Sequence, residues 1–173
     1  MKHFVSGLKI RTELQDEKGI ATSKNHIGQL FYLQADVSSA LDNLNAALAI
    51  RPKINDQAGA AVTHKNLADV FLFKQLYGKA KEHYRQAMDL KIEMEDYTGA
   101  AGSASFLGNI VSDLGDYEGA LVYYNMSLDL NSSIEDLSSI AKDFNNIAEV
   151  HIQQGVLEEA LEANETALGI RTK

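Results

Sequence analysis

The sequence repeats itself every 40 residues without a gap. Four segments beginning at residues 40, 80, 120 and 160 read ALDNLNAALAI, AKEHYRQAMDL, ALVYYNMSLDL and ALEANETALGI. Further columns keep the same spacing: aspartate at 16, 56, 96 and 136, alanine at 21, 61, 101 and 141, and an aliphatic residue at 10, 50, 90, 130 and 170. A fixed period of this length indicates a repeat architecture, in which each repeat buries its apolar face only against its neighbours.

Each repeat is predicted to contain two helices. In the third, the small or apolar residues at 104, 107, 108 and 111 follow the spacing of one buried helix face. The column aspartates stand where an N-cap accepts the free amides of the first turn. The break between helices lies near Gly115 and Gly155, where glycine suits a left-handed helix end, while Ala35 and Gln75 fill the same slot and predict a less sharp end. The second helix of the third repeat is expected at about 117–134.

Residues 1–14 match only the second helix of a repeat. The sequence therefore predicts about nine helices, with one orphan helix and repeats at about 15–54, 55–94, 95–134 and 135–173. We expect a single array over 1–173 and a fragment of a longer protein, because no polar capping helix follows the last repeat.

Small residues are expected where helix axes approach closely. Glycine or alanine occupies positions 28, 68, 108 and 148, and alanine occupies 40, 80, 120 and 160. The larger Leu44, Tyr84 and Tyr124 would fill the space between helices. This pattern predicts that Gly108 lies against the neighbouring helix pair.

The same residues resemble the tetratricopeptide repeat (TPR). The resemblance rests on Leu107-Gly108, Gly115-Asp116-Tyr117, Ala120, Tyr124 and Ser127, with Pro52 after an earlier second helix, and it covers essentially the whole chain. HEAT arrays have an overlapping period but lack these small residues. The usual TPR period is about 34 residues; the longer period here is similar to that of kinesin light chains, Pins-type adaptors and bacterial TPR signalling proteins. The resemblance implies an all-α fold, a right-handed α-solenoid of antiparallel helix pairs.

Composition excludes several classes of function. The 24 acidic and 16 basic residues leave a net charge of -8, which disfavours nucleic acid as a partner. Without cysteine, disulfides and thiolate chemistry are impossible. No apolar run reaches the roughly 18–20 residues of a membrane span. Nucleotide-binding, zinc-protease and hydrolase motifs are missing, and a calcium-loop-like stretch fails at Ile134 and Ile140. We therefore expect no enzyme activity, no cofactor, no metal and a cytoplasmic location.

In proteins that this chain resembles, the first helices line a concave groove that binds peptides. The resemblance places the contacts around the Leu-Gly/Ala pairs, at Asn25, His26, Gln29, Lys65, Asn66, Asp69, Ser105, Phe106, Asn109, Lys142, Asn145, Asn146 and Glu149. Asparagine is a poor helix former, but its amide can donate to and accept from a peptide backbone. The alternative is that these side chains bond neighbouring helices or water. The basic clamp of chaperone-binding TPRs is not reproduced, since Gly102 and Phe106 stand where it would place cations.

Two functions remain open. The first is a non-catalytic scaffold that binds a protein or peptide, of unknown identity, in this groove. The second is a sensory or dimerisation module of a larger bacterial signalling protein, such as a kinase, cyclase or regulator. The last helix carries Leu157, Leu161 and Leu168, and its apolar face predicts end-to-end self-association.

Overall fold

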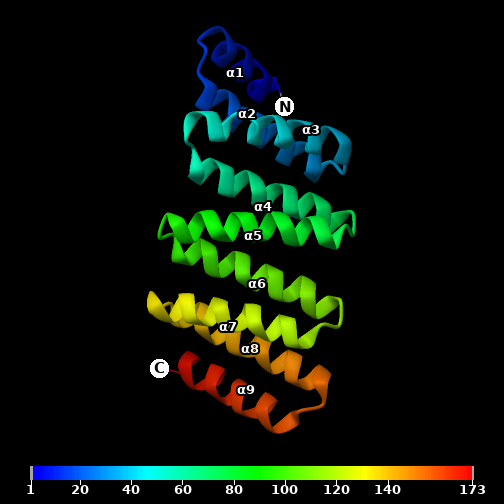
Figure 1. Ribbon diagram of the computed structural model, residues 1–173, viewed down its shortest axis with the longest axis vertical. Helices are drawn as coiled ribbons and strands as arrows, with labels where there is room; N and C mark the ends of the chain where they lie inside the picture. The colour runs from blue at the N-terminus through cyan, green and yellow to red at the C-terminus, as the bar shows by residue number, and fades with distance from the viewer. Residues whose placement is uncertain (1, 173) are drawn as a thin grey trace. The chain divides into compact units, whose positions relative to one another are not determined.

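The structure, a computed structural model, describes residues 2–172, with side chains from Ser6 onward. This part of the chain contains nine α-helices, one short 3-10 helix and no strand (Figure 1). They are α1 (Lys2–Glu13), α2 (Glu17–Leu33), α3 (Val37–Leu48), η1 (Arg51–Ile54), α4 (Gln57–Phe73), α5 (Tyr77–Glu93), α6 (Tyr97–Asp113), α7 (Tyr117–Ser133), α8 (Leu137–Gln154) and α9 (Leu157–Arg171).

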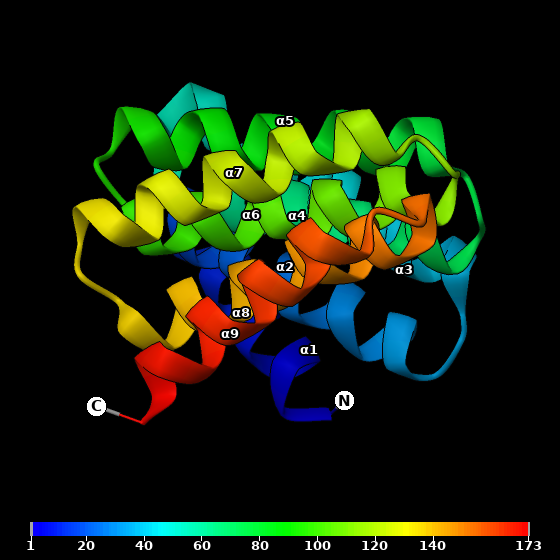
Figure 2. The same ribbon diagram turned by 90° about the horizontal axis from the view of Figure 1, so that it is seen from below.

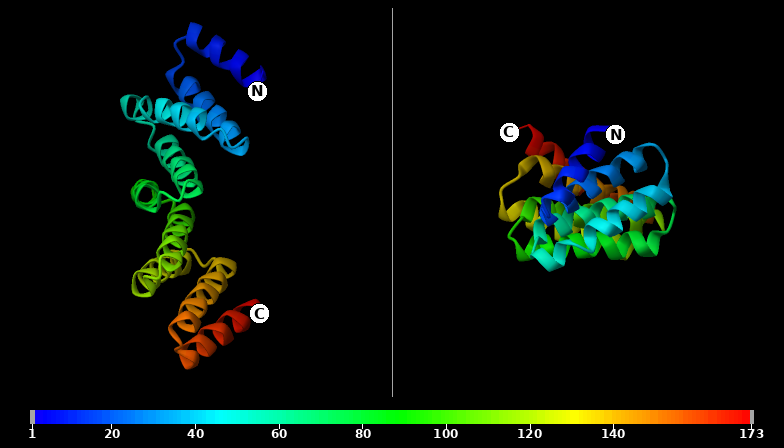
Figure 3. Two further views of the ribbon diagram at one scale, coloured as in Figure 1. Left: turned by 90° about the vertical axis from the view of Figure 1, so that its right-hand side faces the viewer. Right: turned by 90° about the horizontal axis from the view of Figure 1, so that it is seen from above.

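The helices fall into two compact units, residues 1–90 and 91–173, which we describe separately. In the first unit α2 packs against α1 and α3, and α4 packs against α3. In the second unit α7 packs against α6 and α8, and α9 packs against α8. The pairs are antiparallel hairpins, as Figure 2 shows from below and Figure 3 shows from the side for α8 and α9. The predicted all-α array of antiparallel helix pairs is confirmed within each unit.

The cores are built from the small-residue columns of the repeat. The alanines at 21, 61, 101 and 141 and those at 40, 80, 120 and 160 are all buried. In the second unit the larger Val111, Tyr124 and Ile147 pack around Ala120 and Ala148. Because alanine is small, it allows the axes of packed helices to approach closely at these positions.

Gly108 contacts a different helix from the one predicted. A Cβ atom on Gly108 would lie 2.7 Å from the ring of Tyr124 in α7, which is the second helix of its own pair. Gly28 is equivalent: its Cβ would lie 2.7 Å from Leu44 in α3. The expectation that Gly108 faces the neighbouring pair is therefore wrong. The bulky side chain of the second helix fills the space directly over the small residue of the first.

Aspartate caps most of the helices. Asp16, Asp56, Asp96 and Asp136 each accept a hydrogen bond from the backbone N–H three residues later, which confirms the predicted N-caps. Two further aspartates, Asp36 and Asp116, cap the second helices α3 and α7 in the same way.

All eight turns of the array have the same backbone geometry. One residue in each turn is left-handed, with φ between 53° and 79°: Gln15, Ala35, Asn55, Gln75, Glu95, Gly115, Glu135 and Gly155. The expectation that helices end less sharply at Ala35 and Gln75 is therefore wrong. The residue after each turn residue donates its N–H back to the preceding helix, as Asp36 does to the Phe31 carbonyl at 2.9 Å, and this bond holds the turn residue left-handed.

Replacing the turn glycine Gly115 with alanine should lower the free energy of unfolding by about 1 kcal/mol. A left-handed residue with a Cβ is strained by about 1–2 kcal/mol, partly offset by lower chain entropy in the unfolded state. Gly102 is the control, because it lies inside α6 and, like Gly115, has open space around its Cα. Gly102→Ala should raise the free energy of unfolding by about 1 kcal/mol. Urea denaturation of both variants measures the two changes, and shifts of the same sign would contradict the turn geometry.

Pro52 shortens one second helix. α3 ends at Leu48 and is 12 residues long, whereas α5 and α7 are each 17. Proline has no N–H to continue the helical ladder, so the chain continues as η1, with Pro52 in its first turn. The change of path directs the Arg51 side chain into the unit, where it is 4% exposed.

Polar side chains join each second helix to the first helix of the next repeat. We call these four contacts the cross-repeat bonds. Their donors stand at 11, 51, 91 and 131, and each acceptor stands 12 residues later, at 23, 63, 103 and 143. They are Arg11 Nη1 to Ser23 Oγ, Arg51 Nε to Thr63 Oγ1 (2.9 Å), Lys91 Nζ to Ser103 Oγ (3.2 Å) and Asn131 Nδ2 to Asp143 Oδ2 (2.7 Å).

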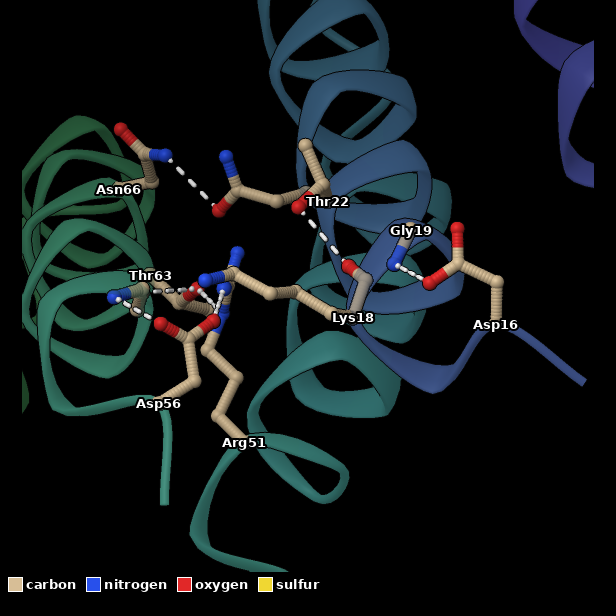
Figure 4. Close-up of polar contacts among 10 residues, drawn as sticks. Asp16, Lys18, Gly19, Thr22, Arg51, Asp56, Thr63 and Asn66 are labelled. Carbon is tan, nitrogen blue, oxygen red and sulfur yellow. Dashed lines mark hydrogen bonds and ion pairs between the residues drawn. The ribbon is translucent and has the colours of Figure 1, made fainter. Parts of the chain in front are cut away.

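Figure 4 shows the second of these bonds. Arg51 extends from η1 toward both Thr63 and the N-cap Asp56, with which it forms a buried ion pair. Burial is the largest single effect on the Asp56 carboxyl and raises its pKa. The Gly59 N–H, the Arg51 guanidinium and the charge of Lys18 together outweigh burial, so the Asp56 pKa lies below its usual value. Arg51 therefore fixes the beginning of α4 with one side chain.

Glycine makes room for the long cationic donors. A Cβ on Gly59 would lie 1.6 Å from Arg51 Nη1, and Cβ atoms on Gly19 and Gly99 would crowd the side chains of Arg11 and Lys91. The fourth repeat has Ser139 in this column, where the donor is the short Asn131 and no long side chain crosses the helix. Ser139 instead donates to the N-cap Asp136 at 2.7 Å.

Gly59→Ala should lower the free energy of unfolding by about 1–3 kcal/mol, because the new methyl group displaces the buried Arg51 guanidinium. Gly78→Ala is the matched control in the same unit: Gly78 lies in α5 with no atom within 4 Å of an added Cβ. The control should melt at or above the wild-type temperature. If both variants melt alike in calorimetry, Gly59 is not needed for the passage of Arg51.

No helix among the described residues is long and apolar enough to cross a membrane. On α9, Leu157, Leu161 and Leu168 are 66%, 60% and 63% exposed, while the alanines between them are buried. This apolar face agrees with the one expected from the sequence, and the end-to-end self-association inferred from it stays a prediction.

Candidate functional site

A cleft of about 440 Å³ lies in the first unit between α2, α3 and α4. It brings together five of the predicted groove residues, from two helices 40 residues apart in the repeat. We call it the first cleft; its lining consists of His26, Gln29, Leu30, Tyr32, Leu33, Leu44, Lys65, Asn66, Asp69 and Val70.

The apolar part of the first cleft continues onto the surface. Leu33 at its edge is 78% exposed. The ring of Tyr32 meets Phe73 edge-on, with centroids 5.9 Å apart, and Phe73 is itself 58% exposed. Tyr32 and Leu33 therefore border one side of the cleft, and Phe73, in contact with Tyr32, extends the apolar surface beyond it.

Asn66 occupies the centre of a hydrogen-bond chain between α2 and α4. Its Nδ2 donates to Asn25 Oδ1 at 3.0 Å, and its Oδ1 accepts from Gln29 Nε2 at 3.0 Å. Asn25 and Asn66 are only 3% and 6% exposed. The alternative given for the predicted asparagines, that they bond neighbouring helices, is therefore the one observed for Asn25 and Asn66, whose amides bond to each other across α2 and α4.

The charged residues of the first cleft are paired. Lys65 Nζ lies 2.7 Å from Asp69 Oδ2, and Tyr84 of α5 donates its hydroxyl to Asp69 Oδ1. Burial, with a further contribution from Asp69, raises the pKa of Tyr84 well above its usual value. The hydroxyl therefore stays protonated and keeps Asp69 fixed in the cleft.

Asn66→Ala should lower the free energy of unfolding by about 1–3 kcal/mol, because it leaves the buried Asn25 carbonyl and the Gln29 amide without their partner. Asn146 is the matched control. Its Nδ2 makes the equivalent bond to Ser105 in the second unit, at 3.4 Å and in a half-buried place that water can reach. Asn146→Ala should cost less than about 1 kcal/mol. If urea denaturation shows the same loss in free energy of unfolding for Asn66→Ala and Asn146→Ala, the buried hydrogen-bond chain of Asn25, Asn66 and Gln29 is not the stabilising feature.

A second cleft, of about 350 Å³, lies in the second unit between α6, α7 and α8. Each residue that lines it stands 80 positions after a residue of the first cleft. The lining is Asn109, Ser112, Asp113, Tyr124, Asn146, Glu149 and Val150. Three of these, Asn109, Asn146 and Glu149, are predicted groove residues, so the repeat places a cleft at the same position in both units.

The two clefts differ in chemistry. Where the first has Tyr32, Leu33 and Leu44, the second has Ser112, Asp113 and Tyr124. The Tyr124 hydroxyl donates to Asn109 Oδ1 at 2.7 Å. Burial, followed by the nearby Asp113 and Asp143, raises the pKa of Tyr124 to about 12. The first cleft is therefore mostly apolar, and the second is polar and acidic.

The remaining predicted residues lie elsewhere. Ser105 and Lys142 line a smaller cavity of about 90 Å³. Phe106 is 39% exposed, and Asn145 is half-buried. The small cavity also contains Asp143, which accepts from Ser127 at 2.9 Å and from Asn131, and burial raises its pKa despite these two bonds. Asp143 thus belongs to the helix packing.

The sequence prediction missed the residues one turn further along each first helix. Tyr32, Leu33, Ser112 and Asp113 stand three or four positions after the predicted Gln29 and Asn109, and they lie on the same face. The helical i, i+3, i+4 spacing could have identified them. The prediction followed the residues that flank the Leu-Gly/Ala pair and stopped there.

A histidine pair lies between α4 and α5, with the Nδ1 atoms of His64 and His83 2.9 Å apart. The His83 ring also stacks on Phe71, with centroids 5.3 Å apart. Burial, and then the neighbouring His83, lowers the pKa of His64 to about 4, so the pair is neutral at pH 7. Among the side chains that the structure describes, from Ser6 onward, no group of three or more histidine or acidic residues could hold a metal ion. The pair holds α5 against α4.

Residues 19–93 match the family model of the tetratricopeptide repeat. No curated protein matches the chain. Among solved structures, BtubC (BKLC) from P. vanneervenii is similar over 98% of this chain and 70% of its own, with a TM-score of 0.87 and 18% identity.

Two larger proteins share the fold. Aspartyl phosphate phosphatase F from Bacillus subtilis has a TM-score of 0.79 and 15% identity, over 98% of this chain and 49% of its own. A signal transduction ATPase with numerous domains and a tetratricopeptide repeat sensor, from Pyrococcus horikoshii, has a TM-score of 0.82 and 18% identity. The match covers 90% of this chain and 25% of the ATPase. This chain therefore spans about half of the phosphatase and a quarter of the ATPase.

Proposed function

We propose that this chain, whose residues 19–93 match the tetratricopeptide repeat family, is a non-catalytic scaffold that binds a peptide segment of a partner protein along its first helices. The observation that carries this proposal is the recurrence of a cleft at the same repeat position in both units. Each cleft combines apolar surface with side-chain amides, which can pair with the main chain of an extended or helical peptide.

The first cleft suits an apolar anchor residue of such a peptide. Leu30, Leu44 and Val70 line it, and the exposed Leu33 extends its apolar surface. Gln29 and Asn66 lie beside this surface, although Asn66 is already bonded to its neighbours. The main-chain contacts of the peptide therefore fall to Gln29, while the apolar residues supply most of the binding energy.

The charged residues of the first cleft are held in place by contacts with one another and with Tyr84. Here Lys65 pairs with Asp69, and Tyr84 is held protonated by burial and by its bond to Asp69. These groups fix one another in place, which suits a rigid recognition surface.

The second candidate function is a sensory or dimerisation module of a larger signalling protein. It is favoured by the likeness to the archaeal ATPase, whose described sensor is a tetratricopeptide repeat, and to the bacterial phosphatase. The apolar face of α9 would serve end-to-end self-association in such a protein. We place both functions in the cytoplasm.

Selection of a random peptide display library against the folded chain tests the scaffold proposal. Selected peptides should carry a bulky apolar residue and should lose at least about tenfold in affinity for Leu33→Asp, because the new charge stands at the edge of the apolar cleft. Leu33 is 78% exposed, so the variant should keep the wild-type melting temperature.

Leu14→Asp is the matched control, since Leu14 is 72% exposed in the same unit, outside the cleft. It should bind the selected peptides as the wild type does. The proposal fails if the library yields no peptide that binds the wild-type chain, or if the two variants lose affinity equally.

A further inference from the structure

The second cleft carries two carboxylates that are not neutralised by a cation. In the first cleft Asp69 is paired with Lys65, four residues earlier on the same helix. The equivalent residue Glu149 has Asn145 at that position, so it lacks this lysine. Glu149 accepts only a neutral amide, Gln153 Nε2 at 2.9 Å. Asp113 replaces Leu33, and no ion pair within residues 2–172 involves either Asp113 or Glu149.

Neutral groups of the second cleft also present oxygen atoms. Asn146 donates its Nδ2 to Ser105, which leaves its Oδ1 as an acceptor. The Tyr124 hydroxyl donates a hydrogen bond to Asn109 Oδ1, and its oxygen can accept a further hydrogen bond. Asp113 also acts on Tyr124, since it contributes to the raised pKa of that phenol. The cleft therefore offers acceptors and negative charge to a single occupant.

The same cleft has an apolar part of the right kind for a long side chain. The Tyr124 ring and Val150 line it together with the polar groups. The methylene stem of a lysine or arginine packs on apolar surface while its charged head remains among polar groups. The lining thus matches both parts of a cationic side chain.

We propose that the second cleft binds a lysine or arginine side chain of the partner segment. This inference rests on the proposed scaffold function and adds the kind of residue that the partner must present. It follows from charge complementarity: Asp113 and Glu149 carry unpaired negative charge in a cleft whose equivalent in the first unit is neutralised internally. The two clefts consequently select different side chains, an apolar one in the first unit and a basic one in the second.

Nuclear magnetic resonance of the isotopically labelled chain tests the proposal with two small probes. They are the blocked tripeptides Ala-Arg-Ala and Ala-norleucine-Ala, which differ in the charge of the central side chain. The arginine probe should shift the side-chain amide signals of Asn109 and Asn146 and should bind at least about fivefold more tightly than the norleucine probe, the upper range of one exposed ion pair. Added sodium chloride should weaken the binding of the arginine probe and leave the binding of the norleucine probe unchanged.

The double variant Asp113→Asn, Glu149→Gln should lose this preference, again by about fivefold or more. Asp129→Asn, Glu162→Gln is the matched control: it removes the same charge from exposed positions of the same unit and should behave as the wild type. The proposal is overturned if both probes bind the wild-type chain with equal affinity. It is also overturned if the control variant loses as much of the preference for the arginine probe as the cleft variant does. It is also overturned if magnesium or calcium chloride shifts the same signals and displaces the arginine probe at lower concentration, because the cleft would then be a metal site.

The outcome is separable from that of the scaffold proposal. The peptides selected from the display library test binding at the first cleft, through the effect of Leu33→Asp on their affinity. If they bind there and retain full affinity for the Asp113→Asn, Glu149→Gln variant, only the basic-residue inference fails. If no peptide is selected but the arginine probe still binds at Asn109 and Asn146, the cation site stands and the scaffold proposal fails.

Discussion

The cross-repeat bond between the end of a second helix and the next first helix is the interaction on which each unit depends. Alanine contacts bring helices close but do not distinguish one register from another, since one alanine packs much like the next. A directional bond does distinguish them. Arg51 reaches both Thr63 and Asp56, and a shift of α4 by one residue would leave a buried guanidinium without its partners. Breaking a buried pair in this way typically costs about 3–5 kcal/mol.

The clefts depend on the same bonds. Thr63 and Asn66 are three residues apart on α4, so fixing the first places the second opposite Asn25 and Gln29. In the second unit Asn131 and Ser127 hold Asp143, and Asn146 follows three residues later with its bond to Ser105. The position of the cleft lining is therefore set by buried polar contacts one turn away.

Much of the fold could be predicted from the sequence because the deciding interactions are local and repeated. The period located the helix pairs, and the aspartate column located the caps at Asp16, Asp56, Asp96 and Asp136. The errors concern contacts between segments. Which helix Gly108 faces, and whether Asn66 is buried, depend on the partner helix, and one sequence does not contain that information. Ala35 was misjudged because its left-handed backbone is imposed by hydrogen bonds of its neighbours.

The candidate site could be predicted in part for the same reason. The resemblance to the tetratricopeptide repeat indicated which helices line the clefts, and the residues that it implied include His26, Gln29 and Lys65 of the first cleft and Asn109 of the second. It could not indicate how far along each helix a cleft extends, so Tyr32 and Asp113 were missed. The cleft chemistry also depends on positions where the repeats differ, such as Lys65 and Asn145. The effect of such a position on the charge of the cleft can be judged only when the position of the neighbouring carboxylate is known.

The last cross-repeat bond carries its charge on the acceptor and not on the donor, and this difference makes the repeats non-interchangeable. In three junctions a long cation passes over a glycine to reach a hydroxyl, whereas in the fourth a short amide reaches the carboxylate of Asp143 beside Ser139. A recombinant that joined Arg51 to the fourth first helix would force the guanidinium against the serine side chain. The reverse exchange, which joins Asn131 to the second first helix, would leave Thr63 and the N-cap Asp56 without the long donor that reaches them. Donor, glycine or serine, and acceptor therefore match one another across the repeat boundary, and a crossover between donor and acceptor would break that match.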